Sequence, residues 1–96
     1  MSLVAFYFYN KGGYLCLTFF AQQCRRLYNN YEFTYNMFGN SEELQGKLYT
    51  NAIKDIDDMV AKYKKTGFSS AELAFYSRLY KRKLFTHYYS RVKRLA

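Results

Sequence analysis

Apolar side chains between Leu48 and Tyr63 recur with the period of an α-helix. At 100° per residue they fall within an arc of about 140° that no charged residue enters, so one side of this segment must be buried. The residues of this arc are Leu48, Tyr49, Ala52, Ile53, Ile56, Met59, Val60 and Tyr63. The pattern predicts a long amphipathic helix that packs against another part of the chain.

Signals at both ends set the bounds of this helix. Asn40 or Ser41 can serve as its N-cap, and two glutamates follow in the first turn, where the helix dipole favours negative charge. Gly67 follows the lysines of the last turn, at a position that favours positive φ. We therefore expect a helix over about Ser41–Lys65.

A second helix is predicted to follow, over about Ser69–Arg94. Ser69 or Ser70 can cap it, Glu72 lies in its first turn, and Phe68 is placed as a hydrophobic staple. Its apolar arc consists of Leu73, Tyr76, Tyr80, Leu84, Tyr88 and Leu95. Because the connection is short, we expect the two helices to pack as an antiparallel pair.

The N-terminal 38 residues favour β-structure. Leu3–Tyr9 is β-branched and aromatic, Asn10–Gly13 supplies residues for a tight turn, and an apolar run follows over Tyr14–Ala21. Tyr31–Phe38 alternates apolar and polar residues, as a half-buried strand does. The sequence therefore predicts a single α+β domain, in which a small N-terminal antiparallel sheet (a hairpin plus a third strand) packs on two C-terminal antiparallel helices.

A helix over Leu15–Asn30 is the alternative to the second strand. Apolar residues in and just after this segment recur at intervals of three and four, as the buried side of a helix requires. They are Leu17, Phe20, Cys24, Leu27 and Tyr31. We expect a strand up to Phe20 and a short helix over Gln22–Asn29, and an all-α fold is the second possibility.

Positive charge is concentrated at the C-terminus. The net charge is +8, and residues 73–96 contain seven basic residues and no acidic one. These seven residues are Arg78, Lys81, Arg82, Lys83, Arg91, Lys93 and Arg94. Such a block fits nucleic acid, an anionic membrane surface or an acidic protein surface.

Basic and aromatic residues share one side of the predicted C-terminal helix. Opposite the apolar arc lie Arg78, Lys81, Arg82, Lys93, Phe75, Phe85 and Tyr89. Cationic side chains can neutralise phosphates while exposed rings stack on bases, as in sequence-tolerant binding of single strands. In the alternative, the basic side is merely solvated and the rings pack under the N-terminal strands or a second copy of the chain. Arg25 and Arg26 would extend the basic surface if they lie beside this helix.

No residue pattern points to catalysis or to a metal centre, so we expect neither an enzyme nor a cofactor. Asp58 is spaced to pair with Lys54 at i,i+4, which explains the acidic residues there as a salt-bridged outer side. His87 is the one histidine and is expected to be a satisfied boundary residue. Cys16 and Cys24 lack a metal-binding or redox spacing and are expected to be buried free thiols in a reducing compartment.

Membrane and secretion signals are also weak. The longest uncharged run, 12–24, is shorter than the ~20 residues that a membrane-spanning helix needs. The N-terminal segment does not show the charge and apolar pattern of a secretory signal. We therefore expect a soluble protein of the cytoplasm.

Two hypotheses about function follow from these features. The first is a small, basic, non-enzymatic protein that binds nucleic acid through its C-terminal helix. The second is a protein-interaction module, for example an anti-defence inhibitor that docks on a host protein or ribonucleoprotein. In its size and its richness in Tyr, Asn and Lys the chain resembles the small binding proteins of phages, archaeal viruses and mobile elements. Homodimerisation through the same aromatic residues is compatible with either hypothesis.

Overall fold

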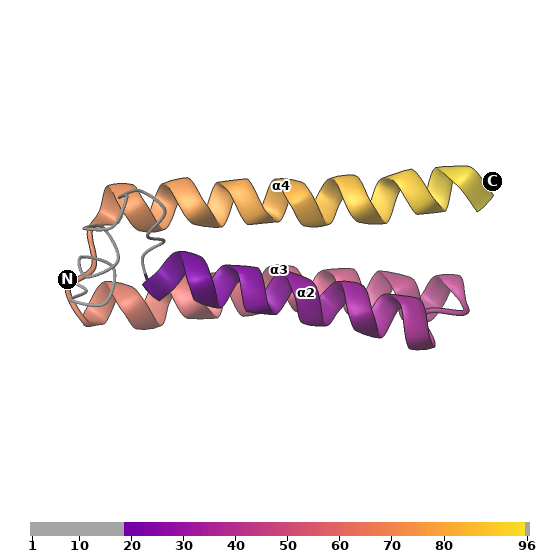
Figure 1. The fold of residues 1–96 in the computed structure, drawn as a ribbon, viewed down its shortest axis with the longest axis horizontal. Coiled ribbons are helices and arrows are strands. Elements are labelled where there is room, and N and C mark those ends of the chain that lie inside the picture. Colours follow the sequence, from indigo (N-terminus) through magenta and orange to yellow (C-terminus); the bar gives the residue numbers. More distant parts are fainter. Residues whose placement is uncertain (1–18, 96) are drawn as a thin grey trace, which may run out of the picture.

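The protein folds into helices that run up, down and up. The computed structural model describes the backbone of residues 19–95 and the side chains of residues 19–91. Helix α2 comprises Phe19–Phe38, α3 comprises Glu42–Lys65, and α4 comprises Ser70–Leu95. Helix α3 is antiparallel to the other two, and each helix contacts both of its neighbours (Figure 1). The described part of the chain is therefore a helical bundle.

The predicted α+β fold is wrong, because residues 19–95 contain no strand. Tyr31–Phe38, predicted as the third strand, forms the second half of α2. The second predicted strand, which was expected to end at Phe20, runs into the first turn of α2, because this helix begins at Phe19. The predicted strand Leu3–Tyr9 and the turn Asn10–Gly13 lie outside the described residues. Within the described range, the all-α alternative is correct.

Burial along α2 explains why this segment is helical. The side that faces α3 and α4 carries Phe20, Cys24, Leu27, Tyr31 and Tyr35, spaced by three and four residues. Tyr31 and Tyr35 are buried, whereas Phe33 and Met37 are 61% and 59% exposed. The alternation that suggested a strand therefore arises from two pairs of residues, each spaced i,i+4 along a helix. Tyr31 and Tyr35 form the buried pair, and Phe33 and Met37 form the exposed pair.

The two predicted C-terminal helices are confirmed, including the signals at their ends. Ser41 caps α3, because its Oγ accepts a hydrogen bond from the Leu44 amide at 3.2 Å. Ser69 Oγ accepts a hydrogen bond from the Glu72 amide at 3.3 Å at the start of α4. Gly67 has φ of +92°, the left-handed conformation expected after the end of α3. The two serine hydroxyls satisfy backbone amides that have no partner within the helices.

The core runs between the helices as two connected clusters. The first consists of Tyr31, Tyr35, Ala52, Ile56 and Leu84. The second consists of Phe20, Cys24, Tyr63 and Leu73. Val60 and Tyr80 pack against both clusters, so the apolar interior is continuous along the bundle. The apolar arc predicted for α3 lies entirely in or against this core, and so does the arc of α4 as far as Tyr88.

Candidate functional site

The surface of α4 that faces away from the core carries exposed aromatic rings beside basic side chains. We define the basic aromatic face by Arg78, Lys81, Arg82, Phe85 and Tyr89. Phe85 is 50% exposed and Tyr89 is 44% exposed, so neither ring is buried against α2 or α3. Phe75 and Leu79 are also exposed on α4. The rings therefore remain available to a ligand.

Neighbouring tyrosines hold the exposed rings in place. Tyr88 stacks on Tyr49 of α3, with ring centroids 4.6 Å apart and planes within 7° of parallel. Tyr89 meets the Tyr88 ring edge-on at 4.9 Å, and the centroids of Phe85 and Tyr89 are 4.5 Å apart. Aromatic contacts of this geometry are favourable. The face is thus partly organised before any ligand binds, which lowers the entropy cost of binding.

The charges of the basic aromatic face are unequal. Arg78 and Arg82 are exposed, and no carboxylate of residues 19–91 lies within 4.0 Å of either guanidinium. Lys81 instead forms an ion pair with Asp57 of α3, with Nζ 2.6 Å from Oδ1. Arg78, Arg82 and Phe85 line a shallow depression of about 490 Å³ against α3. The two arginines are therefore the cations best placed for an anionic ligand there.

Lys83 and Arg91 face a different side of α4, toward α2. Lys83 Nζ lies 5.3 Å from the centroid of the Tyr28 ring and 5.4 Å from that of Tyr80, which are cation–π distances. Arg91 is half-buried, and its Nη1 donates to Ser90 Oγ at 3.3 Å. The predicted basic residues are therefore divided between two surfaces of α4.

The structure describes fewer contacts for the remaining predicted basic residues, which are Arg25, Arg26, Lys93 and Arg94. Arg25 is exposed on α2, and its charge lowers the pKa of Tyr80 on α4 against the larger effect of burial, so Arg25 lies on the α4 side. Arg26 is exposed one residue further round α2. Lys93 and Arg94 belong to the last turn of α4, and their side chains lie outside the described ones. Arg25 is thus placed near Tyr80 of α4, outside the basic aromatic face as defined above.

Sequence reasoning missed a buried cluster at the α2–α4 contact, the Tyr–His cluster of Tyr28, Tyr31, Tyr35 and His87. His87 is only 5% exposed, and the rings of Tyr31 and Tyr35 lie 5.0 and 4.9 Å from its ring. Its Nδ1 lies 3.0 Å from the Tyr31 hydroxyl, while its Nε2 is buried without a partner among the described residues. His87 was expected at the boundary of the core. The helical spacing of the two tyrosines was the signal for this cluster.

We expect the free energy of unfolding to fall as pH falls below about 6.5, the ordinary pKa of histidine. Burial, then the charge of Arg91, lowers the pKa of His87, and Glu32 opposes this shift. Among the described residues, Arg91 of α4 and Glu32 of α2 are the groups whose charges act on its pKa. The unfolded chain therefore binds the proton more readily than the folded one, so acid favours unfolding.

Urea unfolding at pH 7.5 and pH 5.0 measures this effect. The midpoint should be lower at pH 5.0, and replacement of His87 with Gln should remove most of the difference. A midpoint that is the same at both pH values, or a pH dependence that persists in the variant, contradicts the expectation.

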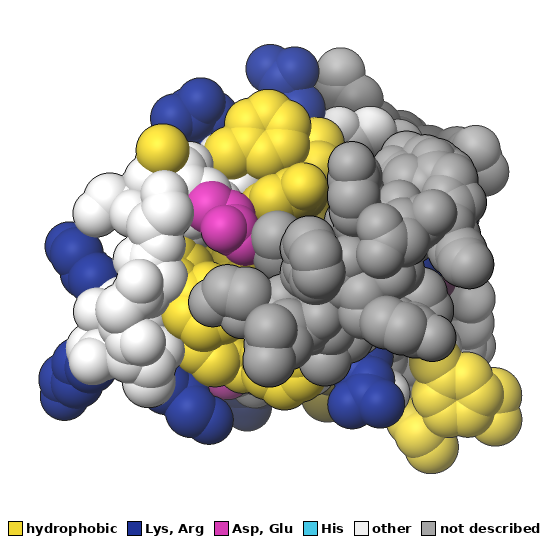
Figure 2. All heavy atoms as spheres, turned by 60° about the vertical axis from the view of Figure 1, so that its left-hand side comes forward, with side chains coloured by type: hydrophobic (Ala, Val, Ile, Leu, Met, Phe, Trp, Pro, Cys, Tyr) yellow, Lys and Arg dark blue, Asp and Glu magenta, His cyan; other side chains and the backbone are white. Residues whose placement is uncertain are grey.

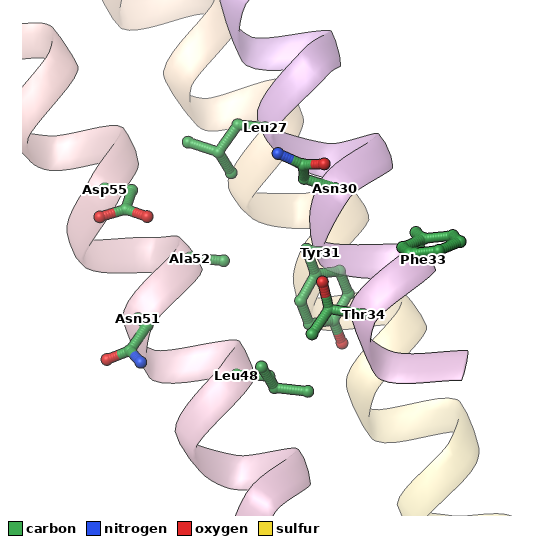
Figure 3. Close-up of a pocket in the computed structure, with 9 residues that line it drawn as sticks. All are labelled: Leu27, Asn30, Tyr31, Phe33, Thr34, Leu48, Asn51, Ala52 and Asp55. Carbon is green, nitrogen blue, oxygen red and sulfur yellow. The ribbon is translucent and has the colours of Figure 1, made fainter. Parts of the chain in front are cut away.

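The groove between α2 and α3 offers a contrast to the basic surfaces. It has a volume of about 400 Å³ and is lined on its polar side by Asn30, Asn51 and Asp55. Leu27 and Ala52 point across it toward the opposite helix, whereas Phe33 points away from α3 (Figure 3). No basic residue lines this groove. It therefore has no complementarity to an anion.

Positive charge is also present beyond α4. Figure 2 looks toward the end of the bundle where α3 ends and α4 begins, and Lys and Arg side chains are spread around its outline. Lys62, Lys64 and Lys65 lie in the last turn of α3, where cations complement the helix dipole. These lysines have a structural explanation, so we do not assign them to the site.

Two further predictions, the i,i+4 ion pair of α3 and the buried thiol of Cys24, are confirmed. Lys54 and Asp58 form the expected i,i+4 ion pair at 3.2 Å. Cys24 is a buried free thiol, and burial raises its pKa to about 12; Cys16 lies outside the described residues.

Within residues 19–95 we find no cluster of three His, Cys, Asp or Glu side chains that could hold a metal ion. No helix of this part is both long and apolar enough to cross a membrane.

Comparison with known proteins gives no further guide to the site. No protein-family model, curated protein or solved structure matches the chain.

Proposed function

We propose that the protein binds single-stranded nucleic acid through the basic aromatic face. The exposure of Phe85 and Tyr89 beside Arg78 and Arg82 is the observation that carries the proposal. Aromatic rings stack on bases of any sequence, and arginines neutralise the phosphates between them. The basic aromatic face carries both the rings and the arginines on α4, and the opposite side of this helix packs in the core.

Fluorescence anisotropy with labelled single-stranded DNA, single-stranded RNA and duplex DNA at several salt concentrations tests this proposal. Exchanging both Arg78 and Arg82 for Gln should reduce the slope of log affinity against log salt by about 1.4, or about 0.7 for each phosphate that is no longer neutralised. Exchanging Phe85 or Tyr89 for Ala should weaken binding by about 1–3 kcal/mol if that ring stacks on a base.

Matched controls come from other surfaces of the same bundle. Lys64→Gln with Lys65→Gln removes two charges from the end of α3, and Phe33→Ala removes a ring that is 61% exposed on α2. These variants should retain the affinity and most of the salt slope of the natural chain. The proposal is wrong if no oligonucleotide binds at low salt, or if the control variants lose as much affinity as the site variants.

Docking on a protein is the second candidate, and Phe75 and Leu79 favour it. They are 55% and 40% exposed and extend the apolar part of the α4 surface beyond the basic aromatic face. Aromatic side chains beside arginine are typical of the centres of protein interfaces. An absence of oligonucleotide binding at low salt would make this candidate the function to pursue.

A further inference from the structure

A groove between α2 and α4 lies on the side of α4 next to the basic aromatic face. It has a volume of about 420 Å³, and four of its nine lining residues are charged. Its lining includes Tyr28, Glu32, Arg82, Lys83, His87 and Arg91. Arg82 also lines the depression beside Phe85, so this one side chain borders both surfaces.

The cations of this groove lack anionic partners. Among residues 19–91, no carboxylate lies within 4.0 Å of Arg82, Lys83 or Arg91. Glu32 is the one acidic residue in the lining, so the groove carries an excess of two positive charges. The rings of Tyr28 and Tyr80 hold Lys83 Nζ at the α2–α4 contact. The groove is therefore a region of positive potential.

His87 adds a buried donor that lacks an acceptor. If the Tyr31 hydroxyl donates to Nδ1, the imidazole proton lies on Nε2, and one buried group is left unsatisfied. In the other tautomer, Nδ1–H donates to the hydroxyl, and both the Tyr31 proton and the Nε2 lone pair lack partners. Buried polar groups without partners are costly, so the first tautomer is favoured. What His87 lacks is thus a hydrogen-bond acceptor.

We propose that the α2–α4 groove binds a phosphate group, with Lys83 and Arg91 supplying the charge that holds it. A phosphate oxygen accepts charge-assisted hydrogen bonds from ammonium and guanidinium groups, and its charge compensates the unpaired cations. Arg82 connects this site to the basic aromatic face, so a strand whose bases stack on Phe85 and Tyr89 can place a backbone phosphate in the groove. The proposal of a phosphate site depends on the groove alone. It rests on the proposed function only where it names nucleic acid as the source of the phosphate.

Because His87 is the one histidine of the chain, its imidazole signals in an NMR spectrum can be assigned without ambiguity. Titration with inorganic phosphate, against sodium chloride at equal ionic strength and fixed pH, should move these signals in a saturable way. In Lys83→Gln and in Arg91→Gln, the dissociation constant for phosphate should rise about tenfold, the change expected when one charge-assisted hydrogen bond is removed. Lys47→Gln, which changes an exposed lysine of α3 outside the groove, should bind phosphate as the natural chain does. Circular dichroism of each variant establishes that it is folded.

A second titration with a short single-stranded oligonucleotide separates this proposal from the proposed function. Perturbation of His87 by both ligands supports the groove as the place where a backbone phosphate binds. Perturbation by inorganic phosphate alone supports the phosphate site and overturns nucleic acid as its source. If the oligonucleotide binds by anisotropy but neither ligand moves the His87 signals, the groove proposal is overturned and the proposed function stands. Equal phosphate affinity in the natural chain and in both groove variants also overturns it.

Discussion

Replacement of Leu84 with Ala is expected to lower the free energy of unfolding by about 2–5 kcal/mol. Leu84 is fully buried in the cluster where all three helices meet, with Tyr31 of α2 and Ile56 of α3. The shorter side chain loses its apolar burial and leaves a cavity that rigid neighbours fill only in part. Urea or thermal unfolding followed by circular dichroism measures the decrease in stability.

The matched control for this prediction is Leu79→Ala, the same change on the same helix. Leu79 is 40% exposed, so its truncation should cost less than about 1 kcal/mol. Equal costs in the two variants would contradict the placement of α4, because they would mean that its two sides are equally buried.

Replacement of Tyr31 with Phe is expected to cost about 1–3 kcal/mol. The change keeps the ring, which packs against His87, and removes the hydroxyl that lies 3.0 Å from Nδ1. Both nitrogens of the imidazole are then buried without partners. The loss of stability is therefore larger than that caused by removing one exposed hydrogen bond. Urea unfolding at pH 7.5, where the imidazole is neutral, gives the cost directly.

Tyr35→Phe provides the comparison one helical turn away. The Tyr35 hydroxyl is also buried, but it has no partner among the described residues. Its removal takes away an unsatisfied polar group, so the variant should be as stable as the natural chain or slightly more stable. If Tyr35→Phe is as damaging as Tyr31→Phe, the hydrogen bond to His87 is not the source of the effect.

The helices α3 and α4 could be predicted from the sequence because several independent signals agree there. Ser41 and Ser69 supply caps, Gly67 supplies the positive φ between the helices, and the apolar arcs are long. Each signal is local, so none of them depends on knowing the rest of the fold. The observed bounds differ from the predicted ones by one residue at most.

Helix α2 was predicted wrongly over Tyr31–Phe38 because its pattern fits two periods. Alternating aromatic residues favour a strand by propensity, yet the same residues also form i,i+4 pairs. Tyr35 continues the series of Phe20, Cys24, Leu27 and Tyr31, and this longer series would have decided for a helix. Burial against α3 and α4 is a tertiary effect that overrides the local preference of aromatic residues for strands.

The residues of the basic aromatic face could be grouped from their angular positions, but their surroundings could not. An angle on α4 does not say which side another helix covers, so the exposure of Phe85 and Tyr89 needed the structure. The positions of Lys83 and Arg91 beside α2 depend on α2 being a helix, which the sequence left open. The pairing of Lys81 with Asp57 likewise depends on the register between α3 and α4.

That ion pair determines where positive charge remains unpaired on α4. Asp57 cancels the charge of Lys81 at the α3 seam, so the positive charge that remains unpaired there belongs to Arg78 and Arg82. At the opposite seam, Lys83 and Arg91 have no acidic partner within 4.0 Å among residues 19–91. An anionic chain that crosses α4 therefore meets unpaired cations on both sides of the neutralised Lys81, and Arg82 borders both surfaces.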